Sequence, residues 1–312
     1  MGRGFHIALA AYARQQVKNL RYSRLKICAT SHENPIAPAV FFDQTECMQA
    51  KRPMKTKGVF FDLYGTLLIL GNMQQAWADW MGALFGAMGL RVPSLTKTAF
   101  DDCCHEFFRK EPPLLIEDGL TVFERRIGRL ASTLGSTLEV PDLKKAATLA
   151  IDAWQAHIHL DPEALEVLAV LSQTSTLALI SNFDHPPHAY RVLRETGLDA
   201  YFRTIVISGD VGIKKPAPGI FQIALDATGL LAQEVVYVGD TQEDVEGATA
   251  AGMRPILIAR PADLSKPRML DYVRKDHQPD QRDLQHRPSR IQSSESLTIS
   301  SLREVITLMD IL

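Results

Sequence analysis

The feature that most constrains the fold is a regular alternation of short apolar segments with amphipathic segments in the second half of the chain. Short apolar runs separated by helix-length amphipathic stretches are typical of βαβ units, whose strands are parallel. Another short buried strand is predicted at residues 57–62, before Gly65. Parallel sheets of this kind bind ligands at the carboxyl ends of their strands. Beyond residue 160, the predicted helices are 163–172, 187–197, 217–229 and 242–252, and the predicted strands are 176–181, 204–207, 235–239 and 255–259.

Residues 73–157 follow a different pattern, because their apolar residues recur at helical spacing and few of them are β-branched. This pattern predicts about four helices inserted after the first strand. Asp161 and Pro162 then indicate a helix start, with Asp161 as the N-cap and Pro162 at the first helical position. The predicted organisation is therefore a sheet core formed by residues 57–72 and 159–312, and an all-helical domain at residues 73–158 that is inserted into it.

Residues 1–56 are interpreted as an N-terminal extension because their charge differs from that of the rest. The first 57 residues carry ten Lys or Arg and three Asp or Glu, a net charge of +7, whereas the whole chain carries −2. Three interpretations stay open: translation starts at Met54, the segment is a targeting sequence, or it belongs to the fold. Residues 261–292 are rich in Pro, Arg, Asp, Gln and His, and are predicted to form an exposed loop before a last strand and helix at 297–312.

The composition excludes several classes of protein. With 46% hydrophobic and 22% charged residues, the chain is typical of soluble globular proteins. A net charge of −2 gives no reason to expect nucleic acid or a membrane as partner, and no apolar run reaches the ~18 residues of a membrane span. None of the four cysteines has metal-ligand spacing, so we expect reduced thiols in a cytoplasmic protein. These cysteines are Cys28, Cys47, Cys103 and Cys104.

Two polar clusters follow the first two predicted core strands. The first is Asp-Leu-Tyr-Gly-Thr at residues 62–66, where a carboxylate leaving a buried strand is costly unless a partner pairs with it. The second is Ser-Asn-Phe-Asp at residues 181–184, where a hydroxyl and nearby backbone N–H groups can bind an anionic oxygen. Each cluster alone is also explained by a turn or a helix cap.

Two further clusters lie later in the chain. Lys-Lys-Pro-Ala-Pro at residues 214–218 places a lysine before a helix start, where its ammonium can reach a carboxylate or a phosphate. Gly239 and Asp240 follow a predicted strand, and Asp244 comes four residues after Asp240. Two carboxylates at this spacing can share one Mg²⁺ ion, which prefers a few carboxylates together with water and substrate oxygens.

The order of these clusters is more specific than any one of them. Asp-x-x-Gly-Thr, Ser-Asn, Lys-Pro-x-Pro and Gly-Asp-x-x-x-Asp on successive strand–helix junctions resemble the four motifs of the haloacid dehalogenase superfamily. The resemblance extends over residues 58–260. Within the superfamily, the chain is similar to the haloacid dehalogenase-like hydrolase branch in particular. It implies an α/β fold in which a Rossmann-like parallel sheet core carries an inserted all-helical cap domain, and a small-molecule substrate.

The resemblance also implies catalytic roles for individual residues. Asp62 would be the nucleophile, whose carboxylate forms a covalent ester that water hydrolyses. Lys215 would neutralise charge between Asp62 and the substrate. Thr66 and Ser181 would hold the group being transferred, and Asn182 would position the nucleophile or the substrate.

A Mg²⁺ site is implied in the same way. Its ligands would be Asp62, the main-chain carbonyl of Tyr64, and Asp240, while Asp244 would support either the metal or Lys215. Together with Lys215, the ion would stabilise charge on the transferred oxygens in a pocket from which the cap excludes water.

Tyr64 departs from the pattern of the phosphatases in this superfamily, which carry an aspartic acid two residues after the nucleophile. A phenol is a poor base at neutral pH, and Asp-x-Tyr-Gly-Thr resembles the 2-haloacid dehalogenases, whose halide leaves without a proton. Asp240 and Asp244 argue against a 2-haloacid dehalogenase, because those enzymes need no metal. Phe221 argues against it as well, because those dehalogenases carry a tyrosine at that position. We expect a Mg²⁺-dependent phosphatase of a small phosphorylated metabolite. The alternatives are a dehalogenase-like C–X hydrolase, or a weakly active member that binds a metabolite or a protein.

Several cap residues and two histidines are weaker candidates. The aromatic residues are expected to pack in the cap core rather than line a substrate pocket, and the arginines could bind a substrate carboxylate or phosphate. His185 could carry a proton, although a solvated loop position is preferred. The oligomeric state, monomer or dimer, stays open. These candidates are Trp77, Trp80, Phe107, Phe108, Arg109, Arg125, Arg126, His185 and His188.

Overall fold

The computed structural model describes residues 55–90, 92, 95–104, 116–260 and 297–312. The described residues from Thr56 onward belong to one compact unit. The predicted N-terminal extension up to residue 54, the predicted loop at 261–292, and the cap candidates at 107–109 lie outside the described residues.

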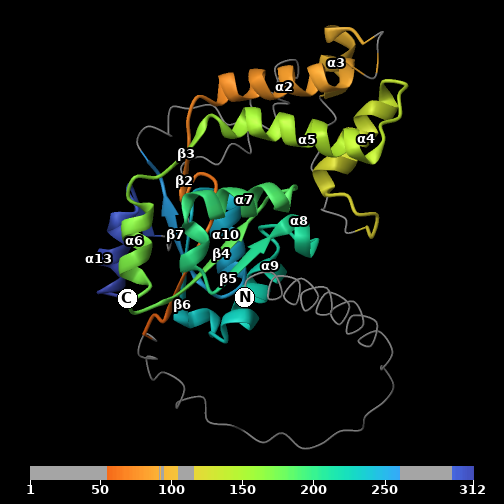
Figure 1. Cartoon of the computed structure of the whole chain (residues 1–312). Helices are drawn as coiled ribbons and strands as arrows, with labels where there is room; N and C mark the ends of the chain where they lie inside the picture. The colour runs from red at the N-terminus through yellow and green to blue at the C-terminus, as the bar shows by residue number, and fades with distance from the viewer. Residues whose placement is uncertain (1–54, 91, 93–94, 105–115, 261–296) are drawn as a thin grey trace, which may run out of the picture. The chain divides into compact units, whose positions relative to one another are not determined.

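A six-stranded parallel sheet forms the centre of the core (Figure 1). Its order is β5-β4-β1-β6-β7-β8, so the chain extends the sheet first to one side of β1 and later to the other. In sheets of this topology, ligands bind at the carboxyl ends of the strands where the direction of winding reverses. The strands are β1 (Gly58–Phe61), β4 (Thr176–Ser181), β5 (Thr204–Ile207), β6 (Val235–Gly239), β7 (Arg254–Ile258) and β8 (Leu297–Ile299).

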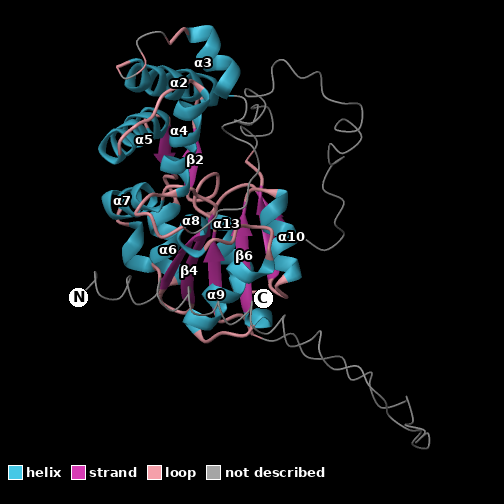
Figure 2. Cartoon of the chain, turned by 90° about the vertical axis from the view of Figure 1, so that its right-hand side faces the viewer, coloured by secondary structure: helices cyan, strands magenta, loops and turns pink. Residues whose placement is uncertain are grey.

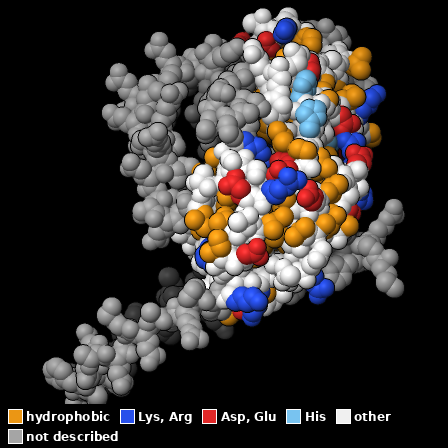
Figure 3. All heavy atoms as spheres, turned by 90° about the vertical axis from the view of Figure 1, so that its left-hand side faces the viewer, with side chains coloured by type: hydrophobic (Ala, Val, Ile, Leu, Met, Phe, Trp, Pro, Cys, Tyr) orange, Lys and Arg blue, Asp and Glu red, His pale blue; other side chains and the backbone are white. Residues whose placement is uncertain are grey.

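Helices cover both faces of this sheet (Figures 1 and 2). Val59 and Phe61 point into one apolar cluster with residues of α6, α7 and α13, whereas α9 and α10 pack on the opposite face. The outer surface beside α6 and α13 mixes apolar side chains with acidic and basic ones (Figure 3). The helices are α6 (Ala164–Leu171), α7 (Pro186–Thr196), α8 (Ser208–Val211), α9 (Pro218–Thr228), α10 (Gln242–Ala250) and α13 (Arg303–Met309), with 3₁₀ helices η2 (Leu198–Tyr201) and η3 (Ala232–Glu234).

The segment between β1 and β4 builds a second hydrophobic cluster, separate from that of the sheet. Trp80 and Leu84 are buried in it, as the helical periodicity predicts, and Ile127 of the same segment is buried with them. None of the described helices is both long and apolar enough to cross a membrane. The helices of this segment, which is called the cap below, are α2 (Met73–Gly89), α3 (Lys97–Cys104), α4 (Val122–Thr133) and α5 (Val140–Gln155).

The two connections between core and cap contain short strands that the sequence analysis did not predict. β2 (Leu68–Leu70) and β3 (Ile158–Leu160) pair antiparallel beside each other. Three-residue strands are too short to show an alternating pattern, which explains why they were missed.

The predicted start of the helix after β3 is wrong. α6 begins at Ala164, and the N-cap is Glu163. Asp161 instead accepts a hydrogen bond from the N–H of Glu163 at 2.8 Å, so it caps the turn that precedes the helix. The pattern of Asp followed by Pro fits a turn as well as a helix start.

The separate cap cluster leads to a stability prediction. Leu84→Ala on α2 removes a side chain that is 0% exposed, so the free energy of unfolding should fall by ~2–4 kcal/mol in urea titrations. Leu149→Ala on α5, where the leucine is 44% exposed, is the matched control and should change it by less than ~0.5 kcal/mol. Equal losses for the two variants would contradict the assignment of a packed cap core.

Candidate active site

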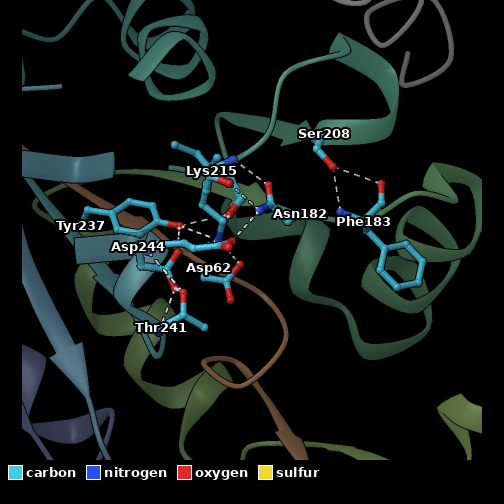
Figure 4. A network of polar contacts seen from close by, with 10 residues as sticks. Asp62, Asn182, Phe183, Ser208, Lys215, Tyr237, Thr241 and Asp244 are labelled. Atoms are coloured by element: carbon cyan, nitrogen blue, oxygen red, sulfur yellow. Dashed lines mark hydrogen bonds and ion pairs between the residues drawn. The ribbon is translucent and has the colours of Figure 1, made fainter. Parts of the chain in front are cut away.

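The ammonium of Lys215 lies at the centre of the site (Figure 4). Its Nζ donates to Oδ1 of Asp62 and to Oδ1 of Asp244, both at 2.6 Å. The carbonyl of Ile180 and the hydroxyl of Tyr237 share its third hydrogen, at 3.3 and 3.1 Å from Nζ. Asp62 follows β1, Lys215 precedes α9 and Asp244 lies at the start of α10. The fold thus brings these three predicted site residues together at the carboxyl edge of the sheet.

Burial decides the electrostatics of this ion-pair network. Burial raises the pKa of Asp62 to about 6, and the nearby Lys215 only partly offsets it. For Lys215, burial lowers the pKa, but Asp244 and Asp62 outweigh that effect, so its pKa lies above the ordinary value. The lysine therefore stays charged at neutral pH and holds the two carboxylates together.

Asp240 is the carboxylate that lacks compensation. Its Oδ1 is buried and has no hydrogen-bond partner among the described residues, and burial, then Asp62 and Asp244, raise its pKa well above the ordinary range. Carboxylate oxygens of Asp62, Asp240 and Asp244 lie within 4.8 Å of one another. When all three carboxylates are ionised, they and the one ammonium carry two negative charges, which a divalent cation would balance, so the donor set fits Mg²⁺.

Gly65 allows the loop after Asp62 to lie against Asp240. Its φ is +92°, and a β-carbon at this position would lie 2.2 Å from Oδ2 of Asp240. Any other residue would collide with the carboxylate, so the Asp-x-x-Gly-Thr pattern has a steric basis at Gly65.

The contacts of Asp244 favour support of Lys215 over direct binding of a metal. Its Oδ1 accepts from Lys215 at 2.6 Å and from the hydroxyl of Tyr237 at 3.0 Å. Its Oδ2 accepts from the N–H and the hydroxyl of Thr241, at 3.0 and 2.6 Å. Both oxygens are therefore already occupied by donors.

Thr66 and Ser181 are both buried near the carboxyl ends of strands β1 and β4, and their role in holding the substrate stays a prediction. Thr66 is 0% exposed, and its Oγ1 is buried without a hydrogen-bond partner among the described residues. Ser181 ends β4 and is 1% exposed. A buried hydroxyl without a partner is costly, and the predicted contact with a substrate oxygen would supply the missing partner of Thr66.

Asn182 contacts the main chain of Lys215. Its Nδ2 donates to the carbonyl of Lys215 at 3.1 Å, and its Oδ1 accepts from the N–H of Lys215 at 2.8 Å. This reciprocal pair fixes the loop that carries the lysine, and the predicted positioning of the nucleophile or substrate by Asn182 stays a prediction.

The side chain of Tyr64 is directed at the cap. Its hydroxyl donates to Oε1 of Gln155 on α5 at 3.4 Å, and its ring packs on those of Trp154 and Phe183 at centroid distances of 5.1 and 5.0 Å. Burial raises the pKa of Tyr64 above its ordinary value. Tyr64 is therefore a protonated phenol that connects the loop after β1 to the cap.

The expectation that His185 lies in a solvated loop is wrong. His185 is 7% exposed, and its Nδ1 lies 2.9 Å from Oγ1 of Thr121 at the start of α4. The sequence shows the turn around His185 but not the cap helix that packs over it. Arg126 is also engaged, because it pairs with Asp184 at 2.8 Å.

His188 connects the core to the cap through a defined tautomer. Arg191 can only donate, so Nδ1 of His188 accepts from it at 2.8 Å. Nε2 then carries the proton and donates to Oε1 of Gln155 at 2.9 Å. Arg191 also pairs with Asp152 on α5.

Two residues of the site were missed by the sequence analysis. Tyr237 is 0% exposed, and its hydroxyl bonds Asp244 and the carbonyl of Ile180; a tyrosine in an otherwise aliphatic strand is the signal that could have revealed it. Arg260 donates to the carbonyls of Gly65 and Thr66 in the loop after Asp62. No local pattern distinguishes Arg260 from a surface arginine.

Comparison with known proteins identifies the class. Residues 56–252 match the family described as haloacid dehalogenase-like hydrolase, so the chain belongs to that family of hydrolases.

Three similar proteins illustrate the relationship. The chain is 41% identical over 101 residues to a phosphoserine phosphatase of Thermus thermophilus. The matched residues cover 32% of this chain and 40% of that protein. It is 36% identical over 92 residues to a phosphoglycolate phosphatase of Pectobacterium atrosepticum, covering 29% and 39%. The chain thus spans about two fifths of the length of these relatives. The structure of a 2-haloacid dehalogenase from Pseudomonas syringae has a TM-score of 0.53 and 21% identity, covers 82% of this chain and 98% of that one, and shows the shared fold alone.

The buried position of His188 predicts a pH dependence of stability. Burial, and then Arg191, lower the pKa of His188 from 6.5 to about 4. Between these values the unfolded chain binds the proton and the folded protein does not, so stability should fall as pH falls from 6.5 to about 4. Urea unfolding across this range should show the slope, and His188→Gln should reduce it. His159→Gln, at an exposed histidine, is the control, and an equal reduction there would contradict the assignment.

Proposed function

We propose that the chain is a Mg²⁺-dependent phosphatase that acts on a small phosphorylated molecule through Asp62. The observation that carries this proposal is the uncompensated carboxylate of Asp240 beside the Lys215 ion pairs. Burial and the carboxylates of Asp62 and Asp244 raise the pKa of Asp240, so a bound divalent cation would stabilise its ionised form. The names of the matched relatives, two phosphatases, support the same choice.

In the proposed reaction, an oxygen of Asp62 attacks phosphorus while the bond from phosphorus to the leaving oxygen breaks. Lys215 neutralises charge between Asp62 and the phosphoryl group, and Thr66 and Ser181 donate to its oxygens. Mg²⁺ held by Asp62, Asp240 and the Tyr64 carbonyl would supply further positive charge beside those oxygens. Water then hydrolyses the aspartyl phosphate and restores the carboxylate.

The leaving oxygen needs a proton, and Tyr64 occupies the position of the usual acid. Because the phenol stays protonated and is directed at Gln155, we assign proton supply to water. Phosphates with good leaving groups are then expected to react fastest. The cap helices are proposed to select the substrate and exclude bulk water from the site.

Tyr64 also favours a second candidate, a 2-haloacid dehalogenase-like hydrolase, whose halide needs no proton. In that reaction, Asp62 attacks the carbon that bears the halogen, and the bond between carbon and halogen breaks. The two candidates differ in the bond that breaks and in the need for a metal, so a paired assay separates them.

The first functional prediction concerns the reaction class. The protein should release phosphate from p-nitrophenyl phosphate with Mg²⁺, lose that activity with EDTA, and release no chloride from 2-chloropropionate. Asp62→Asn should lower kcat by ~10³-fold or more, whereas Asp226→Asn, at an exposed aspartate outside the site, should not. Chloride release without metal would favour the dehalogenase. No turnover of either substrate would favour a member of the family that only binds.

The second functional prediction concerns the missing acid. Tyr64→Asp should raise kcat toward alkyl phosphates, whose leaving oxygen needs a proton, by ~10²-fold. It should change turnover of p-nitrophenyl phosphate little. Tyr64→Asn is the matched control, because it removes the same ring without adding an acid. An equal gain for both variants would mean that the ring limits access rather than that an acid is missing.

A further inference from the structure

Arg260 bonds the loop of Gly65 and Thr66, which follows Asp62. Arg260 itself follows β7, the neighbour of β6 on the side away from β1. It lies two residues beyond β7, and its side chain is 11% exposed. One nitrogen donates to the carbonyl of Gly65 at 2.6 Å. The other donates to the carbonyl of Thr66 at 2.7 Å and to Oδ2 of Asp161 at 2.5 Å. The planar guanidinium thus bonds three oxygens from two separate segments.

Two successive peptide groups are fixed by these bonds. In a trans peptide, the N–H points away from the carbonyl of the preceding residue. The carbonyl of Gly65 faces Arg260, so the N–H of Thr66 points away from Arg260. The side chain of the same residue carries a buried hydroxyl without a partner among the described residues.

Asp161 extends this arrangement to the connection that returns from the cap. Its N–H donates to the carbonyl of Leu67 at 3.0 Å, and its carboxylate pairs with Arg260 at 2.5 Å. It directly follows β3, which pairs with β2 just after the nucleophile loop. The connections to the cap are therefore bonded to this loop, while Arg260 anchors the loop to the segment after β7 of the core.

We propose that Arg260 is a positioning residue that holds the Gly65 and Thr66 peptide groups, so that Thr66 keeps its N–H and hydroxyl directed at the transferred phosphoryl group. The inference rests on the proposed function only where it names a phosphoryl group as the group that Thr66 contacts. The holding of the loop is a separate physical claim. Lysine cannot replace Arg260 fully, because a single ammonium lacks the planar fork that reaches all three oxygens.

Amide hydrogen exchange tests the holding of the loop without any activity. In Arg260→Met, the amides of Gly65, Leu67 and Leu68, which bond within the loop, should exchange about 10-fold faster or more. Arg303→Met removes another arginine that pairs with acidic residues of a neighbouring helix, and should leave these amides unchanged. Equal exchange in the two variants would overturn the proposal, and Arg260→Gln replaces Arg260→Met if the latter does not fold.

Steady-state kinetics with p-nitrophenyl phosphate test the positioning. Arg260→Met should lower kcat by about 10²-fold while KM changes less than about 3-fold, because the loss falls on the transition state. Arg260→Lys should recover part of kcat, and Arg303→Met should match the unmodified protein. An unchanged kcat in Arg260→Met would overturn the proposal. If the unmodified protein turns over nothing, the proposed function fails and the exchange experiment alone decides the role of Arg260.

Asp161→Asn separates the two kinds of contact that Arg260 makes. It removes the charge of Asp161 but leaves the carbonyls of Gly65 and Thr66 available to Arg260. Exchange and kcat should then stay close to those of the unmodified protein. Losses as large as in Arg260→Met would mean that the ion pair with Asp161 carries the effect, and would overturn the proposal.

Discussion

The buried ammonium of Lys215 is the interaction on which the rest of the site depends. A charge removed from water is tolerated only when it is paired and hydrogen-bonded. Lys215 is 3% exposed, and Asp62, Asp244 and Tyr237 supply its partners. These partners come from β1, β6 and α10, so the sheet register and the start of α10 must both be correct before the lysine can be buried. Formation of the surroundings of Asp62 is thereby coupled to folding of the core.

The sequence predicts the central sheet because its signals are local. The strands β1, β4, β5 and β6 are short apolar runs that end at, or are followed by, a glycine or a polar residue. Their ends gather Asp62, Ser181 and Asp240 by topology alone. The missed elements are those without a local signal. β2 and β3 are three residues each, and they form because the two connections to the cap run side by side.

Side-chain partners were harder to predict than side-chain positions. The amide of Asn182 meets the main chain of Lys215, which lies 33 residues away in sequence. His185 and His188 follow a turn that looks exposed in the sequence, yet cap helices cover both. Such contacts depend on how helices pack across the sheet, and the pattern of apolar residues along one helix does not contain that information.

The antiparallel pairing of β2 and β3 has an evolutionary consequence. The N–H of Gly71 bonds the carbonyl of His157 at 2.9 Å, so the insertion leaves and rejoins the core at adjacent points. A short turn between these two strands would close the same ribbon as a hairpin. The helical segment can therefore change in length as a module while the sheet of the core keeps its register, and under the proposed function such changes would alter substrate choice and leave the reacting groups in place.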